Sequence, residues 1–287
     1  MQGLAQYEDG YWWSKDSLRL HYRDYGGDAS RPPIICIPGL TRNARDFATV
    51  AERLAPDWRV ICVDLRGRGD STYAKDSLTY APLTYVQDID ALLDHLNIKR
   101  FIAFGTSLGG IVTMLLASTE PGRIAGALLN DVGPALEPNG LDRIKSYVGK
   151  SQSWPTWVHA ARAAAELHGH AHPDFTLVDW IAHAKRLYRV TGQGRIMPDY
   201  DVKIAEPLRM PAGEFDMWPA YQALGDVPVL ITRGALSDVF SPTIADEMVK
   251  RLPSAKLVTV DGVGHAPLLK EAPVVAAIDD LLGAIPK

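Results

Sequence analysis

The sequence is poor in three features that mark particular classes of protein: runs of basic residues, long apolar runs and cysteine. Its 287 residues carry 30 Lys and Arg against 34 Asp and Glu, which gives a formal net charge of −4. No segment gathers Lys or Arg into a stripe that could follow a phosphate backbone. Nucleic acid is therefore not an expected partner.

The N-terminal segment has neither of the features that direct a chain into or across a membrane. From Met1 to Asp9 there is no basic start and no apolar stretch. A secretory signal needs both, and a membrane-spanning helix needs about 20 apolar residues. We therefore expect a cytoplasmic protein with no membrane partner.

Cysteine is limited to Cys36 and Cys62, and each lies inside an apolar run of the kind that forms a buried parallel strand. Free cysteine in such a place behaves as a small core hydrophobe. We expect two reduced thiols, and neither a disulfide nor a metal site.

What the sequence does contain is typical of a globular protein, with 47% hydrophobic and 22% charged residues. The length fits one large α/β domain with an inserted subdomain. No internal repeat or low-complexity segment is present.

Short apolar segments alternate with amphipathic ones along most of the chain. Residues 11–25 predict an antiparallel hairpin, and the alternation that follows predicts a parallel sheet with helices on both faces. The expected strands are 33–37, 59–63, 100–104, 124–130, 227–232 and 256–260. A helix is expected to begin at Ser241-Pro242, with Ser as its cap, and a last helix to end the chain.

The alternation stops near residue 134 and resumes at residue 227. Residues 134–217 look helical, polar and aromatic, without clear strands, so we predict a helical cap there and a core made of 1–133 and 218–287. The helices expected in this cap are 141–148, 155–168 and 176–191.

A G-x-S-x-G motif, Gly105-Thr-Ser107-Leu-Gly109, lies between an apolar strand and an apolar helix. This is the context that the motif requires, because a larger side chain at either glycine would clash in so tight a turn. The turn exposes the hydroxyl of Ser107 and points the N-terminus of the helix at an oxyanion formed beside it. Ser107 is therefore the predicted nucleophile.

A serine hydroxyl needs a base at neutral pH, and His265 follows the last expected strand on a glycine-rich loop. The alternative is a buried structural histidine. An acid should orient the imidazole, and the sequence offers two candidates. We favour Asp238, because an aspartate after the penultimate strand is the commoner pattern. Asp131, just after strand 124–130, is then expected to line the cap entrance or hold its hinge.

The oxyanion needs two N–H donors. Leu108, directly after the nucleophile, supplies one, and Leu40, in the loop after strand 33–37, is the best candidate for the other.

Together these residues resemble the α/β-hydrolase superfamily, and Asp64-Leu-Arg66-Gly-Arg-Gly-Asp-Ser71 is similar to its D-x-R-G-x-G-x-S loop. The resemblance is closest to capped carboxylesterases, enol-lactonases and carbon–carbon bond hydrolases. It implies the α/β-hydrolase fold, an eight-stranded, mostly parallel sheet with a helical cap. One departure is Pro38-Gly39, where many members have His-Gly, so a polar support near the oxyanion donor is missing. For Asp64 and Arg66 a salt-bridged loop is the favoured interpretation.

The predicted cap is rich in aromatic residues, and Trp154, Trp180 and Tyr188 are candidates for a partly apolar substrate pocket or for the core of the cap. Arg42 could meet a substrate carboxylate or lie exposed on its loop. The run His168-Gly-His170-Ala-His172 is interpreted as a solvated loop rather than a metal site.

The expected function is hydrolysis of a carboxylic ester of a small, partly apolar molecule through an acyl-enzyme, with no cofactor and no metal. Cleavage of a lactone or of a carbon–carbon bond beside a ketone is the first alternative. A ligand-binding sensor without turnover is the second. The oligomeric state is left open.

Overall fold

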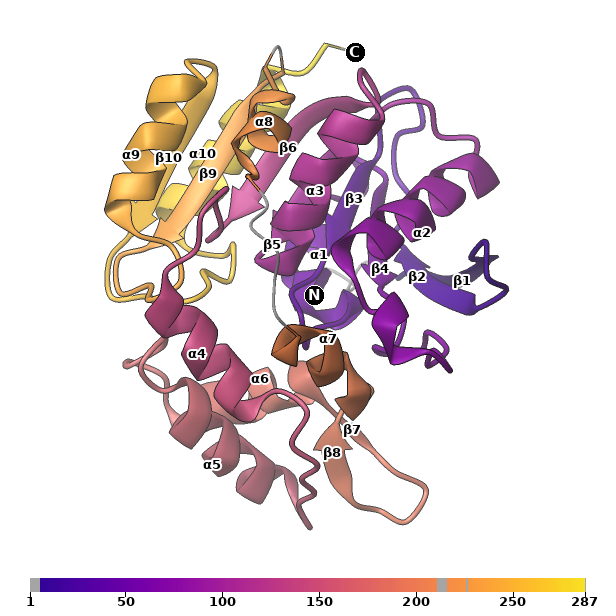
Figure 1. Ribbon diagram of the computed structural model, residues 1–287, viewed down its shortest axis with the longest axis vertical. Coiled ribbons are helices and arrows are strands. Elements are labelled where there is room, and N and C mark those ends of the chain that lie inside the picture. The colour runs from indigo at the N-terminus through magenta and orange to yellow at the C-terminus, as the bar shows by residue number, and fades with distance from the viewer. Residues whose placement is uncertain (1–5, 211–215, 226, 287) are drawn as a thin grey trace.

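The computed structural model describes residues 6–210, 216–225 and 227–286. An eight-stranded sheet in the order β1-β2-β4-β3-β5-β6-β9-β10 forms the body of the molecule (Figure 1). Its first two strands pair antiparallel, β2 also pairs antiparallel with β4, and every other pair is parallel. The predicted α/β-hydrolase fold is therefore confirmed.

The strands follow the apolar segments of the sequence closely. They are β1 (Glu8–Trp13), β2 (Arg19–Asp24), β3 (Ile34–Ile37), β4 (Val60–Asp64), β5 (Phe101–Thr106), β6 (Ile124–Asn130), β9 (Val229–Gly234) and β10 (Ala255–Val260). The central strands β3 to β6 are buried almost throughout, because helices cover both of their faces.

Two apolar layers hold these helices against the sheet. One layer includes side chains of α2 (Pro82–His95), α3 (Leu108–Thr119), α8 (Trp218–Gln222) and α9 (Pro242–Arg251). The other includes those of α1 (Ala48–Leu54) and α10 (Ala272–Gly283). Short 3-10 turns lie at Ala44–Phe47 and Ser77–Thr79.

Both cysteines lie in the second layer, on neighbouring positions of β3 and β4. Cys36 and Cys62 are fully buried and free, as predicted. Burial raises the pKa of the Cys36 thiol well above its usual range, so it stays protonated in the core.

An inserted segment separates β6 from β9 and lies beyond the carboxyl ends of the strands, below the sheet in Figure 1. It contains α4 (Pro138–Tyr147), α5 (Trp157–His168), α6 (Leu177–Leu187), β7 (Tyr188–Val190), β8 (Ile196–Pro198), a 3-10 turn (Val202–Ile204) and α7 (Ala205–Arg209). Residues 211–215 of the predicted cap lie outside the described residues.

The inserted segment differs from the expectation at its third helix and in the residues that follow it. The third helix ends at Leu187, not at residue 191, because Tyr188–Val190 pairs antiparallel with Ile196–Pro198. The expectation that this region has no strands is therefore wrong.

Packing divides the inserted segment into two parts. The helices α5 and α6 meet over their own apolar cluster, in which Ala160, Ala161 and Ala164 allow close approach. The stretch with Ile204 and Ala205 instead joins the main core. The inserted segment therefore packs against the sheet domain through this second part. None of the helices in the described part of the chain has the length and apolarity needed to cross a bilayer.

Candidate active site

The turn between β5 and α3 places Ser107 at the carboxyl edge of the sheet. Its backbone has φ of 52°, a conformation that is costly for any residue with a Cβ. A methyl group on Gly105 would lie 2.4 Å from the carbonyl oxygen of Gly109, and one on Gly109 would lie 1.9 Å from that of Ile37. Both glycines are therefore required for steric reasons, as the motif predicts.

His265, in the loop after β10, contacts the hydroxyl of Ser107 and a carboxylate on opposite sides of its ring. Its Nε2 lies 3.0 Å from Ser107 Oγ, and its Nδ1 lies 2.7 Å from Oδ2 of Asp131. The carboxylate of Asp131 is fully buried and the imidazole is nearly so. Serine, histidine and aspartate thus form one continuous chain of hydrogen bonds.

The aspartate in this chain is not the one that the sequence favoured. Asp238 pairs instead with Arg143 of α4, whose Nε lies 2.5 Å and Nη2 2.8 Å from its two oxygens. The hydrogen bond from Arg143 lowers the pKa of Asp238 despite partial burial. The preference for Asp238 over Asp131 as the partner of His265 is therefore corrected: the loop after β9 turns this carboxylate toward the inserted segment.

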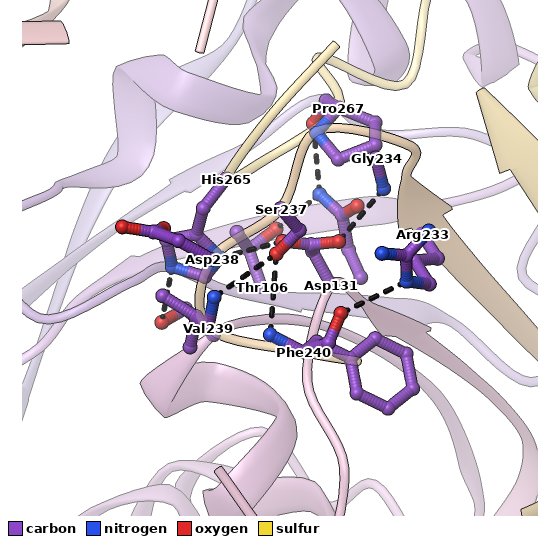
Figure 2. A network of polar contacts seen from close by, with 12 residues as sticks. Thr106, Asp131, Arg233, Gly234, Ser237, Asp238, Val239, Phe240, His265 and Pro267 are labelled. Atoms are coloured by element: carbon purple, nitrogen blue, oxygen red, sulfur yellow. Dashed lines mark hydrogen bonds and ion pairs between the residues drawn. The ribbon is translucent and has the colours of Figure 1, made fainter. Parts of the chain in front are cut away.

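Asp131 is held in place by the same loop after β9. The backbone at Asp131 has a φ of 55°, and its carboxylate accepts hydrogen bonds from the N–H of Gly234 at 2.8 Å and the hydroxyl of Ser237 at 2.6 Å (Figure 2). Ser237 also accepts from the N–H groups of Val239 and Phe240. Ser237 was not predicted, because its place one residue before Asp238 gives no signal of this role.

A second residue that the sequence analysis missed, Asn130, connects the strand ends around the site. Its amide nitrogen donates to Thr106 Oγ1 at 3.0 Å and to the carbonyl of Pro267 at 2.9 Å, and its oxygen accepts from Thr232. The contact with Pro267 fixes the loop that carries His265. A buried polar residue at the end of a central strand was the available signal.

Of the two expected oxyanion donors, Leu40 lines the cavity that includes Ser107, and Leu108 follows Ser107 at the start of α3. Within the described residues, neither the N–H of Leu40 nor that of Leu108 donates a hydrogen bond. Arg68 is fully buried and donates from Nε to the carbonyl of Leu40 at 2.9 Å. This contact supplies a polar support for the loop, so the expectation that such support is missing is wrong.

One cavity includes both Ser107 and His265 in its wall. Leu40, Thr41, Arg42 and Asp46 line it from the sheet domain. From the inserted segment it is lined by Arg143, Ile144, Tyr147, His168, His172 and His183. Arg42 is therefore part of the cavity, with only 17% of its side chain exposed, rather than an exposed loop residue.

The histidine run does not form a solvated loop. His170 is exposed, but His172 is buried and His168 half-buried, and both face the cavity. Burial, followed by the charge of Arg42, lowers the pKa of His168 to about 3 and that of His172 to about 4. Both rings are therefore neutral at pH 7.

All three aromatic candidates belong to the core of the insert or pack against it, and two of them also line a second cavity. Trp154 and Tyr188 have ring centroids 4.7 Å apart and line a cavity that shares Tyr147 and His168 with the first. Trp180 packs in the apolar cluster between α5 and α6, which also includes Tyr188 and contacts Trp154.

The D-x-R-G-x-G-x-S loop is held by ion pairs, as expected. Arg66 is fully buried and pairs with Asp88 and Asp16. Asp64 pairs with His21, and these two with Asp70 are the one group of possible metal ligands that lie close together in the described residues. Because both ring nitrogens of His21 already contact carboxylates, the group is explained by ion pairing.

The fold and the strand–turn–helix at Ser107 are those of an α/β hydrolase, and comparison with known proteins gives the same class. A model of the α/β hydrolase family matches residues 34–278, and the chain belongs to that family.

Relatives of known and unknown activity resemble the chain over most of its length. The 3-hydroxybutyrate-oligomer hydrolase of Cupriavidus necator is 34% identical over 266 residues, which cover 87% of this chain and 87% of that protein. The pimeloyl (acyl-carrier protein) methyl ester esterase of Neisseria meningitidis is 25% identical, over 85% of this chain and 74% of the relative. A crystal structure of an α/β hydrolase from Novosphingobium aromaticivorans matches with 53% identity and a TM-score of 0.95, covering 99% of this chain and 100% of that one.

Proposed function

We propose that the protein is a serine hydrolase that cleaves carboxylic esters through an acyl-enzyme, with Ser107 as nucleophile, His265 as general base and Asp131 as the acid. The observation that carries this proposal is the hydrogen-bond chain from Asp131 through His265 to Ser107. All three side chains come from loops at the carboxyl ends of strands, and two of them line one cavity.

The geometry supports a two-step reaction. The Nε2 of His265 takes the proton of Ser107 as its oxygen attacks the ester carbonyl, and Asp131 stabilises the imidazolium that forms. The N–H groups of Leu40 and Leu108 receive the oxyanion. The imidazolium then gives its proton to the leaving alcohol, and a water activated by the same histidine hydrolyses the acyl-enzyme.

The relative from Cupriavidus necator suggests the first substrates to test, because its name describes hydrolysis of 3-hydroxybutyrate oligomers. Each linkage in such an oligomer is an ester of a short hydroxy acid. The cavity at Ser107 offers apolar contacts from Ile144 and Leu268 beside its polar groups, which suits short, partly apolar acyl chains.

The test uses the wild-type protein and Ser107→Ala with p-nitrophenyl butyrate and the linear dimer of 3-hydroxybutyrate. We expect wild-type turnover and labelling by a fluorophosphonate probe, and the loss of both in Ser107→Ala with unchanged thermal unfolding, because the hydroxyl contributes little packing. More than a few per cent of residual turnover in the variant would show that Ser107 is not the nucleophile.

Lactones and vinylogous diketo acids complete the substrate panel, because similar sites support both reactions. If either kind of compound is cleaved faster than the esters, the proposed function changes from ester hydrolysis to cleavage of that compound. Stabilisation by a ligand without labelling or turnover would instead indicate a sensor.

A further inference from the structure

Two arginines line the cavity at Ser107, one from the sheet domain and one from the inserted segment. Arg42 lies in the loop after β3, and Arg143 lies on α4 of the inserted segment. Each is paired side-on with one carboxylate through Nε and Nη2: Arg42 with Asp46 at 2.6 and 2.7 Å, and Arg143 with Asp238. A guanidinium has five N–H donors, so each pair leaves donors of the arginine for other partners.

Arg42 lies beside the proposed nucleophile. A methyl group placed on Gly39 would touch Cγ of Arg42 at 3.3 Å and Cβ of Ser107 at 3.6 Å. The stem of the Arg42 side chain and the side chain of Ser107 therefore both lie against Gly39, and both residues line one cavity.

The group formed by Arg42, His183 and Arg186 has more hydrogen-bond donors than acceptors. His183 of α6 lies between two arginines, with its Nε2 3.5 Å from Nη1 of Arg42 and its Nδ1 3.4 Å from Nη2 of Arg186. A neutral imidazole has one acceptor nitrogen, so it can satisfy only one of them. Nε of Arg186 is also buried, and within the described residues it has no hydrogen-bond partner.

In the same group of residues, positive charges outnumber negative ones. Arg42 and Arg186 both lie close to the carboxylate of Asp46. Burial first, and then the two arginines, lower the pKa of His183 well below its usual range, and His168 and His172 respond to Arg42 in the same sense. The arginines give this region a positive potential, and the histidines beside them are neutral. Such surroundings favour binding of an anion and disfavour binding of a metal cation.

We propose that Arg42, together with Arg143, binds a free carboxylate of the substrate. The natural substrates are then short esters that carry a carboxylate within a few bonds of the scissile carbonyl. A short hydroxy-acid oligomer, with its terminal carboxylate, is an example. This inference rests on the proposed ester hydrolysis and adds the charge of its substrate.

The experiment compares two substrates that share the scissile ester. One is the linear dimer of 3-hydroxybutyrate with its free carboxylate, and the other is the same dimer with that carboxylate converted to the primary amide. A charge-assisted hydrogen bond contributes about 1.5–3 kcal/mol, so wild-type kcat/KM is expected to favour the acid by about 10- to 100-fold.

The variants Arg42→Gln and Arg143→Gln test where this preference arises. Each is expected to lower kcat/KM more for the acid than for the amide, so that the ratio falls toward one, while Arg42→Lys retains part of it. Arg195→Gln is the matched control: this arginine of the inserted segment bonds Ser153, lies on the exposed β7–β8 loop, and its removal should leave the ratio unchanged.

Fluorophosphonate labelling of Ser107 reports whether each variant is folded. Equal wild-type rates for acid and amide, or an undiminished ratio in both Arg42→Gln and Arg143→Gln, would overturn the carboxylate site and leave ester hydrolysis standing. Absence of hydrolysis and of labelling in the wild type would overturn both proposals.

Discussion

At the scale of single residues, two aspartates after neighbouring strands have different surroundings. Asp131 is fully buried and its carboxylate accepts three hydrogen bonds, one of them from His265. Asp238 is about one-third exposed and is neutralised by Arg143. A buried acceptor that is fixed on three sides is suited to hold one tautomer of an imidazole, and a carboxylate already paired with a guanidinium is not.

We predict that Asp131→Asn lowers kcat by about 10³- to 10⁴-fold, because the amide presents the wrong hydrogen-bond pattern to the Nδ1 of His265. Asp238→Asn should lower kcat less than about tenfold, because its partner is Arg143. Steady-state kinetics on p-nitrophenyl butyrate measures both, with thermal unfolding as a check on folding. A larger loss of kcat in Asp238→Asn than in Asp131→Asn would show that Asp238, the residue that the sequence favoured, is the acid.

The sequence could identify Ser107 and His265 because each stands in a local pattern: glycines around the serine, and a strand followed by a glycine-rich loop before the histidine. The choice between Asp131 and Asp238 has no such local signal. It depends on which way each loop turns after its strand, and that is set by contacts such as the one between Ser237 and Asp131.

At the scale of elements, the junction of β5 and α3 depends on close backbone packing. The start of α3 lies against the end of β3, so the missing side chain of Gly109 leaves room for the carbonyl of Ile37. The same approach brings the loop with Leu40 beside Ser107. The sequence could reveal this junction because only glycine permits it.

We predict that Gly109→Ala destabilises the protein by about 1–3 kcal/mol or more, because the added methyl group would lie 1.9 Å from a backbone oxygen that cannot move without shifting β3. Gly192→Ala is the matched control, since nothing lies within 4 Å of its added methyl group, and its effect should stay within about 0.5 kcal/mol. Urea denaturation measures both. Equal stabilities of the two variants would contradict this packing.

The inserted segment was predicted less well than the sheet. The central strands of the sheet are almost entirely apolar, so they stand out in the sequence. By contrast, β7 and β8 have three residues each; in the described residues they pair with one another and, through Ile196, with Trp154. The polar histidine run also gave a misleading signal. His168 and His172 are withdrawn from solvent by packing against residues distant in sequence, including Tyr147 and His183.

At the scale of the whole molecule, a buried ion pair lies in the sheet away from Ser107 and joins β1, β2 and β4. His21 is fully buried, with Nδ1 2.7 Å from Asp64 and Nε2 2.9 Å from Asp9. Asp64 also accepts hydrogen bonds from the N–H groups of Ala44 and Asp70, so the pair connects this part of the sheet to two loops. Burial opposes protonation of His21, but the hydrogen bond and charge of Asp64, with smaller contributions from Asp9 and Asp70, raise its pKa above 6.5.

This raised pKa gives the last prediction, which concerns the pH dependence of folding. Protonated His21 stabilises the folded state fully below pH 6.5, where the unfolded chain is also protonated, and this stabilisation is lost as the pH rises through the higher folded pKa. His21→Gln should therefore lower the free energy of unfolding at pH 6 by about 1–3 kcal/mol, the contribution of a hydrogen bond to a charged group. The difference from wild type should shrink toward pH 9. Urea denaturation of both proteins at pH 6, 7.5 and 9 measures this difference, and a gap that stays constant or widens as the pH rises would show that His21 is not charged in the folded protein.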